Sequence, residues 1–202
     1  MDRSSIGAAL LAATAWLPGE TAAQGAAREE ARAASGRWSA MLFGGRMTEN
    51  DWTAIVGDPG GVAFAPSNLA GLAVARRLGA WPGALQWEIE GQIVRHWRGQ
   101  DNWEINAPLV ARWSDFPWRE TVETGVAFGL GLSLALGRPD MEHALSGDSS
   151  RLMTYWMLEA SASAPGSPWS LVARIHHRST AYGLFGDSGG SNSLVVGVRR
   201  RF

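Results

Sequence analysis

The sequence predicts an all-β protein, an eight-stranded antiparallel β-barrel of the bacterial outer membrane that follows a signal peptide. Past residue 36, apolar residues recur with a period of two in one segment after another, and turn-forming stretches rich in Gly, Pro, Asp and Ser separate these segments. A period of two is typical of a β-strand, and strands of about ten residues span a bilayer when they are tilted. The sequence also has 11 Trp, which recur at the ends of the segments as an interfacial girdle requires.

The N-terminal region is expected to lie outside the barrel. Arg3 precedes an apolar run from Ile6 to Leu17, and small residues at 21–23 offer a cleavage site before Gln24. This order is typical of a secretory signal peptide, and the apolar run is too short for a membrane-spanning helix. We therefore expect a signal peptide over 1–23, a flexible leader over 24–36 and the barrel over 37–202.

Eight segments show the alternation. It is longest in the segment 122–136, where bulky apolar residues alternate with Glu123 and a series of small residues. A helix would place both sets on every side, whereas a strand separates them onto two faces. The predicted strands are 37–47, 67–78, 85–93, 103–113, 122–136, 151–163, 169–180 and 193–202.

Eight such strands form either a soluble barrel with its apolar face inside or a membrane barrel with its apolar face outside. The opposite faces carry charged and polar residues that fit a hydrated lumen better than a water-exposed surface: Glu88, Glu90, Glu123, Arg174 and His176. The last strand ends in Phe202, which resembles the signal that the outer-membrane assembly machinery reads, although Arg200 is an unusual residue in its outward column. These features favour the membrane barrel and an outer-membrane localisation.

Composition excludes several classes of function. The formal net charge is −1, so no basic surface indicates a nucleic-acid partner. The absence of cysteine excludes disulfides, thiolate chemistry and Cys-ligated metals. His96 and His143 lack partners at the spacing of metal ligands, so we expect neither a metal nor another cofactor.

A polar group is predicted at one end of an apolar face near the C-terminus. Leu171, Ala173, Ile175, His177 and Ser179 alternate onto one face of the seventh strand. In the same way, the eighth strand carries Val198, Val196, Leu194 and Asn192. Both termini of an outer-membrane barrel are periplasmic, so the three polar residues should meet in the outer leaflet, on the lipid side, because neighbouring strands are about 4.8 Å apart.

The same residues resemble a known family. The pattern His177-x-Ser179-x-Ala181, a short Gly-rich loop and a polar residue ten before a terminal Phe are similar to the lipid A 3-O-deacylases over about the last 30 residues. The resemblance implies a carboxylic ester hydrolase on the outside of the barrel that removes the 3-O-linked hydroxyacyl chain of lipid A, the membrane anchor of lipopolysaccharide, without a metal. Thr180 stands where the family usually has Asn, and Asn192 stands where its members have Glu. The loop from Tyr182 to Ser191 also differs slightly in length.

The mechanism of serine hydrolases assigns a role to each of these polar residues. Ser179 is the expected nucleophile, His177 its general base and then acid, and Asn192 the group that orients the histidine, because an amide does this in Cys-His-Asn proteases. Asp187 is the alternative acid, and backbone N–H groups of the loop 183–190 are candidate oxyanion donors. Two alternatives stay open: a phospholipid substrate, and a non-catalytic small barrel with a structural or adhesion role.

Overall fold

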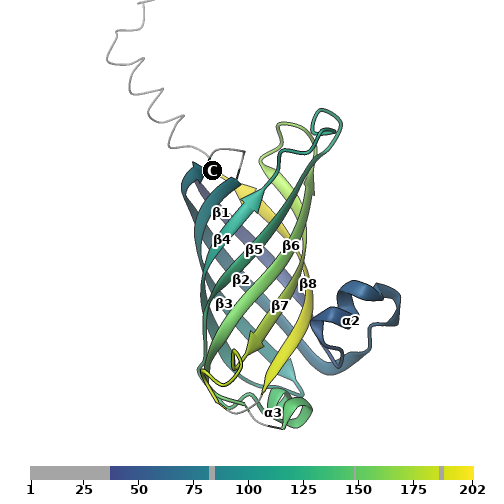
Figure 1. Ribbon diagram of the computed structural model, residues 1–202, viewed down its shortest axis with the longest axis vertical. Coiled ribbons are helices and arrows are strands. Elements are labelled where there is room, and N and C mark those ends of the chain that lie inside the picture. The colour runs from purple at the N-terminus through teal and green to yellow at the C-terminus, as the bar shows by residue number, and fades with distance from the viewer. Residues whose placement is uncertain (1–36, 82–84, 148, 187–188) are drawn as a thin grey trace, which may run out of the picture. The chain divides into compact units, whose positions relative to one another are not determined.

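The barrel predicted from the sequence is present in the computed structural model, which describes residues 37–202 apart from 82–84, 148 and 187–188 (Figure 1). The expected signal peptide and leader lie outside the described residues. In the part that is described, eight strands each pair antiparallel with the next, and β8 pairs with β1 to close the barrel. The strands are β1 (Trp38–Thr48), β2 (Phe64–Trp81), β3 (Leu85–Arg98), β4 (Trp103–Trp113), β5 (Glu123–Ala135), β6 (Leu152–Ser163), β7 (Trp169–Ser179) and β8 (Gly190–Arg201).

Two strands are longer than the alternation predicts, and a bulge explains part of the difference. β2 runs over Phe64–Trp81 rather than 67–78, and β3 continues to Arg98 rather than ending at residue 93. The register between β2 and β3 shifts between Arg77 and Gly79. An extra residue at a bulge moves the following side chains to the other face, so the apolar period stops while the hydrogen-bonded ladder continues.

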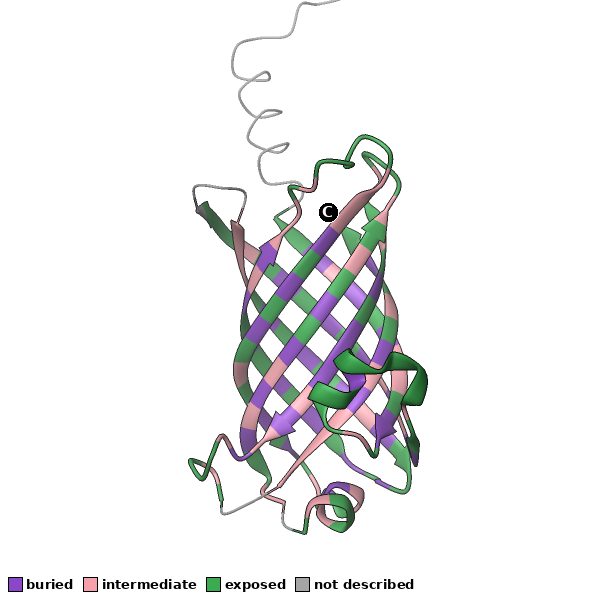
Figure 2. Cartoon of the chain, turned by 45° about the vertical axis from the view of Figure 1, so that its right-hand side comes forward, coloured by how far each residue is buried: buried purple, intermediate pink, exposed green. Residues whose placement is uncertain are grey.

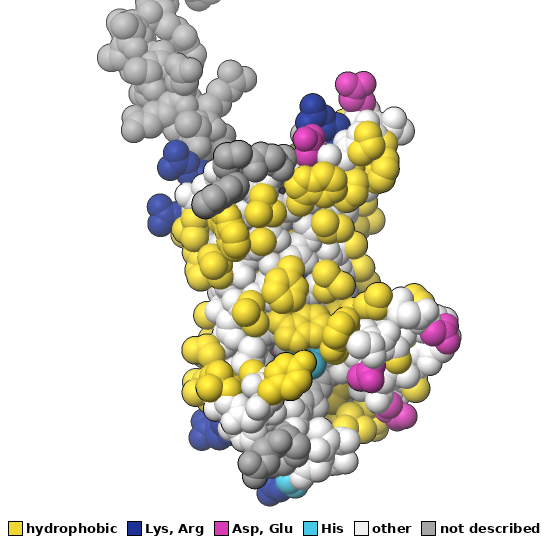
Figure 3. Space-filling model, viewed as in Figure 1, with side chains coloured by type: hydrophobic (Ala, Val, Ile, Leu, Met, Phe, Trp, Pro, Cys, Tyr) yellow, Lys and Arg dark blue, Asp and Glu magenta, His cyan; other side chains and the backbone are white. Residues whose placement is uncertain are grey.

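The two faces of the wall differ as a membrane barrel requires. Buried and exposed residues alternate along the strands (Figure 2). In β4, Ile105 and Leu109 point outward and are 43% and 45% exposed, whereas Glu104 and Asn106 point inward and are buried. On the face that Figure 3 shows, hydrophobic side chains form a belt on the wall, and the charged ones lie near the two ends and on the segment between β1 and β2. Exposed large apolar residues around buried charges are the reverse of a soluble protein, so the membrane barrel is confirmed over the soluble one.

Charged side chains fill the middle of the lumen. Arg174 is fully buried and lies 2.8 Å from Glu90 and 2.6 Å from Glu159. Glu159 also accepts hydrogen bonds from Arg112 at 2.6 Å and from Arg199 at 2.7 Å. Desolvated charges are tolerated when they are paired and hydrogen-bonded in this way.

A second luminal cluster lies nearer the end that is away from the termini. The two carboxylate oxygens of Glu104 contact His176 Nε2 at 2.8 Å and His96 Nε2 at 3.0 Å. The inward orientation predicted for His176 is confirmed, and so is that of Glu88, which pairs with the luminal Arg112.

Two short helices lie at the end of the barrel opposite its termini. Helix α2 (Trp52–Gly57) and the 3-10 turn η1 (Pro59–Gly61) belong to the β1–β2 connection, and α3 (Asp140–Ser146) belongs to the β5–β6 connection (Figure 1). Glu142 of α3 is buried and accepts hydrogen bonds from Arg178 of β7 at 2.7 Å and from Ser191 of β8 at 2.8 Å. These contacts fix α3 to the end of the strand pair that carries the predicted site. Within the described residues, no helix is long and apolar enough to cross a membrane.

Candidate functional site

The β7–β8 register brings two of the three predicted site residues directly opposite each other. His177 pairs with Asn192, and Ser179 pairs with Gly190. His177 Nδ1 lies 2.7 Å from Asn192 Oδ1, a hydrogen-bonding distance. The predicted contact between the histidine and its orienting amide is therefore formed on the outer wall of the barrel.

Ser179 lies two residues beyond His177 on the same face. Two residues of a strand rise about 6.6 Å, and within the described part of the chain the Ser179 hydroxyl makes no hydrogen bond, to His177 or to any other group. Such contacts commonly tighten only when substrate is bound. The structure thus places Ser179 beside the pair without joining it to the histidine.

The apolar column below the site is only partly open to lipid. Leu171 is 68% exposed, as its outward position predicts, but Ile175 in the same column is only 6% exposed. Ile55 of α2 is also buried, at 4%. The β1–β2 connection lies against this part of the wall, because Trp52 at the start of α2 contacts Trp156 of β6. Ile175 is therefore less exposed than its place in this outward-facing column predicts.

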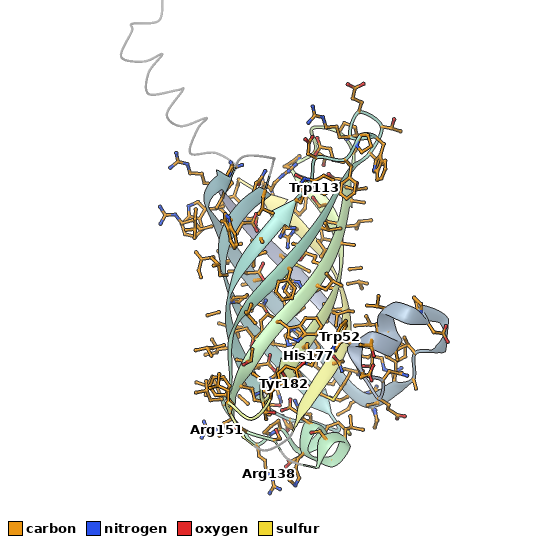
Figure 4. All side chains as sticks on the ribbon, viewed as in Figure 1. Trp52, Trp113, Arg138, Arg151, His177 and Tyr182 are labelled. Atoms are coloured by element: carbon orange, nitrogen blue, oxygen red, sulfur yellow. The ribbon has the colours of Figure 1, made fainter. Side chains whose placement is uncertain are left out.

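An aromatic ring packs on the face of the His177 imidazole. The Trp156 ring stacks on the imidazole with centroids 4.4 Å apart and an interplanar angle of 30°. Trp52 meets Trp156 edge-on, with centroids 5.6 Å apart. Figure 4 shows Trp52 and His177 together on the flank of the barrel, where α2 approaches the wall. The alternation in β6 indicates that Trp156 faces outward, but only the β6–β7 register, which pairs it with His177, shows that it belongs to the site.

The amide of Asn192 has a second partner that the sequence analysis did not identify. Its Nδ2 donates to the main-chain carbonyl of Asn50 at 3.1 Å. Thr48, the neighbour of Asn192 across β1 and β8, donates from Oγ1 to Asn50 O at 3.1 Å and to Asn192 O at 3.2 Å. The β1–β2 connection therefore touches the site through its backbone as well as through Trp52.

The loop after Ser179 begins with strained backbone. Ala181 and Tyr182 have φ angles of 50° and 58°, in the left-handed region that non-glycine residues avoid. Such conformations cost of order 1–3 kcal/mol each and cluster at functional sites. Asp187, the alternative acid, lies outside the described residues.

Several of the candidate oxyanion donors are already used. Phe185 N donates to Thr180 O at 3.0 Å, and Gly190 N donates to Ser146 Oγ at 3.3 Å. Among the described residues, the N–H groups of 181–183 donate to no other group. Successive N–H groups in a turn form a concave site for an anion, and these three begin two residues after the predicted nucleophile.

An apolar groove of about 890 Å³ runs over the outer wall on the side of the site that faces the termini. Its floor includes the small residues Ala160, Ala173 and Gly44, which lie in one row across β6, β7 and β1 with Val196 of β8 between Ala173 and Gly44. Ala173 is four residues before His177, a rise of about 13 Å along the strand. The groove is open to the membrane side of the barrel.

No metal centre accompanies these residues. In the portion of the chain that the structure describes, no group of three or more His, Cys, Asp or Glu side chains is arranged to hold a metal ion. The group that contacts His177 Nδ1 is an amide rather than a carboxylate. The arrangement supports acid–base chemistry by the imidazole, oriented by a neutral hydrogen-bond partner.

The sequence matches no protein-family model and no curated protein. Solved structures are similar in fold. One is the outer membrane enzyme PagL, with a TM-score of 0.61 and 13% identity over 81% of this chain and 99% of that one. Another is Neisserial surface protein A, with a TM-score of 0.50 and 15% identity over 83% of this chain and 98% of that one. The chain therefore has the fold of an eight-stranded outer-membrane barrel, a fold found in both an enzyme and a surface protein.

Proposed function

We propose that this barrel is an outer-membrane serine esterase that removes the 3-O-linked hydroxyacyl chain of lipid A. The observation that carries the proposal is the 2.7 Å contact between His177 Nδ1 and Asn192 Oδ1 on the outer wall, two residues along β7 from Ser179. An imidazole whose Nδ1–H is held by an acceptor presents its Nε2 lone pair to a neighbouring hydroxyl.

The proposed reaction has two steps. Ser179 Oγ attacks the ester carbonyl while His177 Nε2 takes its proton, and the tetrahedral oxyanion is stabilised by the N–H groups of 181–183. Collapse breaks the ester bond, and His177 returns the proton to the departing sugar oxygen. Water, activated by the same imidazole, then hydrolyses the acyl-serine and releases a hydroxy fatty acid.

The position of the site suits a substrate that stays in the membrane. The site lies at the end of the barrel opposite its termini, which is the outer leaflet if the termini are periplasmic as in other outer-membrane barrels. An ester near His177 would direct its acyl chain along the wall, where the groove beside Ala173 offers an apolar surface.

A second candidate is a non-catalytic barrel with a structural or adhesion role. The observation that favours it is the Ser179 hydroxyl, which makes no hydrogen bond with His177 within the described residues. The likeness to Neisserial surface protein A is also compatible with it. The two candidates differ in whether turnover depends on this hydroxyl.

An assay of fatty-acid release by the purified protein in detergent distinguishes the two candidate functions. We expect the protein to release one ester-linked hydroxy fatty acid from lipid A in the presence of a chelator. Ser179→Ala should abolish release, whereas Ser170→Ala, which removes a serine hydroxyl from the other end of the same strand, should retain it. Equal release by the Ser179→Ala protein would exclude the proposed nucleophile, and no release by folded wild-type protein would favour the non-catalytic role.

A further inference from the structure

We propose that the β1–β2 connection is a positioning part of the site, and that the carbonyl of Asn50 fixes the amide of Asn192 so that His177 keeps the tautomer a general base needs. The inference rests on the proposed function for its catalytic meaning. Its structural content, a defined tautomer of His177, can be measured without any activity.

An amide at position 192 creates a problem that a carboxylate does not. Both oxygens of a carboxylate accept hydrogen bonds, so either one selects Nδ1–H on the histidine. An amide has one accepting oxygen and one donating nitrogen. If the Asn192 amide were rotated by half a turn, its NH₂ group would face His177 Nδ1 and select the tautomer protonated on Nε2, which cannot take a proton from Ser179.

The Asn50 carbonyl removes this ambiguity. It lies 3.1 Å from Asn192 Nδ2, and a carbonyl oxygen can only accept a hydrogen bond. The NH₂ group must therefore face Asn50, which leaves Oδ1 at 2.7 Å from His177 Nδ1. One main-chain oxygen on the β1–β2 connection thus determines which ring nitrogen of His177 carries the proton.

The carbonyl is itself held from two directions. The buried Thr48 hydroxyl donates to Asn50 O at 3.1 Å, and the side chain of Asn50 accepts from Ala63 N at 2.7 Å on the returning part of the connection. Glu49 N also donates to Ala63 O at 3.0 Å. The connection is closed at its base like a hairpin, so Asn50 O has a defined position relative to β8.

Helix α2, which follows Asn50, also contacts the site. Asp51 caps α2 by accepting from Ala54 N at 2.8 Å, and Trp52, the first helical residue, meets the Trp156 ring that stacks on His177. The imidazole is therefore held at its edge by Asn192 and on its face by Trp156, and both of these residues are contacted by the same connection.

A nuclear magnetic resonance measurement of the tautomer tests the structural part. We would label the protein with ¹⁵N-histidine, purify it in detergent micelles, and assign the His177 ring signals by their loss in His177→Gln. The expected result is a proton on Nδ1 and none on Nε2. In Thr48→Val/Asn50→Ala, which loosens Asn50 O, the signals should shift towards a mixture of tautomers. A proton on Nε2 in the wild-type protein, or an unchanged tautomer in the loosened variant, would overturn the inference.

Kinetics test the catalytic part with a double-mutant cycle. The loosened variant should lose about tenfold in kcat with little change in KM. In an Asn192→Asp background the same change should not lower kcat, because either aspartate oxygen accepts from Nδ1–H and neither can donate to Asn50 O. An equal loss in both backgrounds would show that Thr48 and Asn50 act only through folding, and would overturn the positioning role.

Two controls separate this inference from the proposed function. Thr124→Val removes a threonine hydroxyl that accepts from Trp118 at the other end of the barrel, and should change neither tautomer nor kcat. Heat-dependent mobility in gels shows whether each variant is folded, and Thr48→Val alone is the milder substitute if the double variant does not assemble. If the tautomer behaves as expected while lipid A remains intact, the esterase proposal fails and the positioning of His177 by Asn50 stands.

Discussion

At the scale of the residue, Asn192 determines how well the imidazole is supported. In the proposed mechanism it orients His177 without carrying a charge, so it would stabilise the imidazolium less than a carboxylate does. Removing its hydrogen bond should lower the reaction rate and leave the wall intact, because the amide contributes to no ladder hydrogen bond between the strands.

Substitution at position 192 should therefore separate orientation from charge. We expect Asn192→Ala to lower kcat by about 10²-fold, at the lower end of the range for general acid–base catalysis. Asn192→Asp should instead raise kcat, since a carboxylate supports the cation. Hydrolysis of lipid A by the purified variants gives both values. Full activity in Asn192→Ala would show that another group, with Asp187 the first candidate, serves the histidine.

Residue-scale predictions from sequence were reliable where they depended on local geometry. Alternation along one strand is a local property, so it correctly placed Leu171 and Ala173 outside and His176 inside. The opposition of His177 and Asn192 could also be predicted, because one short loop joins their strands. Trp156 and Asn50 could not be assigned to the site, because their contacts depend on the β6–β7 register and on the path of a long connection.

At the scale of the element, the β1–β2 connection is the feature that sequence patterns did not predict. The segment between Thr48 and Phe64 reads as a turn rich in Gly, Pro and Asp, yet it forms α2 and lies against the outer wall. Its contacts join residues far apart in the chain. No periodicity within the segment encodes them.

The cap of α2 should make this element sensitive to acid. A hydrogen bond from the Thr53 hydroxyl, together with one from the Ala54 N–H, lowers the pKa of Asp51 below its ordinary value. A carboxyl whose pKa is lowered on folding stabilises the helix above its unfolded pKa, and this contribution is lost as the pH falls through the folded pKa. We therefore expect the protection of the Ala54 amide against hydrogen exchange, relative to its intrinsic rate, to fall below about pH 4.

Asp51→Asn is the matched control, because asparagine caps a helix without titrating in this range. Its Ala54 amide should show no acid-dependent step in protection. Asp51→Ala should exchange fast at every pH. A step that persists in Asp51→Asn would assign the acid sensitivity to another group.

At the scale of the whole molecule, charged side chains pair inside the barrel and apolar side chains cover its outside, as a membrane barrel requires. The lumen holds Arg112, Arg174 and Arg199 around Glu159, with all four side chains largely buried. The alternation predicted that Arg174 and Glu90 face inward, but not that they pair, because they are 84 residues apart.

Glu159 should therefore be the acidic residue that contributes most to the stability of the barrel. Glu159→Gln leaves three arginines without their shared charge, and breaking a buried pair costs about 3–5 kcal/mol. Urea unfolding of the protein in detergent, followed by the gel mobility of the folded form, measures the loss. Glu120→Gln, at an exposed position, should change stability by less than about 0.5 kcal/mol. Equal midpoints for the two variants would contradict the assigned luminal network.

We propose that Ser179 and His177 hydrolyse an ester of lipid A in the membrane that holds the barrel. Mass spectrometry of lipid A from lipopolysaccharide-bearing cells, with and without the expressed protein, tests it most directly. We expect lipid A that lacks one ester-linked hydroxyacyl chain and keeps its amide-linked chains. Cells that express Ser179→Ala or His177→Ala at equal levels in the outer membrane should show unmodified lipid A. Unmodified lipid A in cells with abundant, folded wild-type protein would contradict the claim.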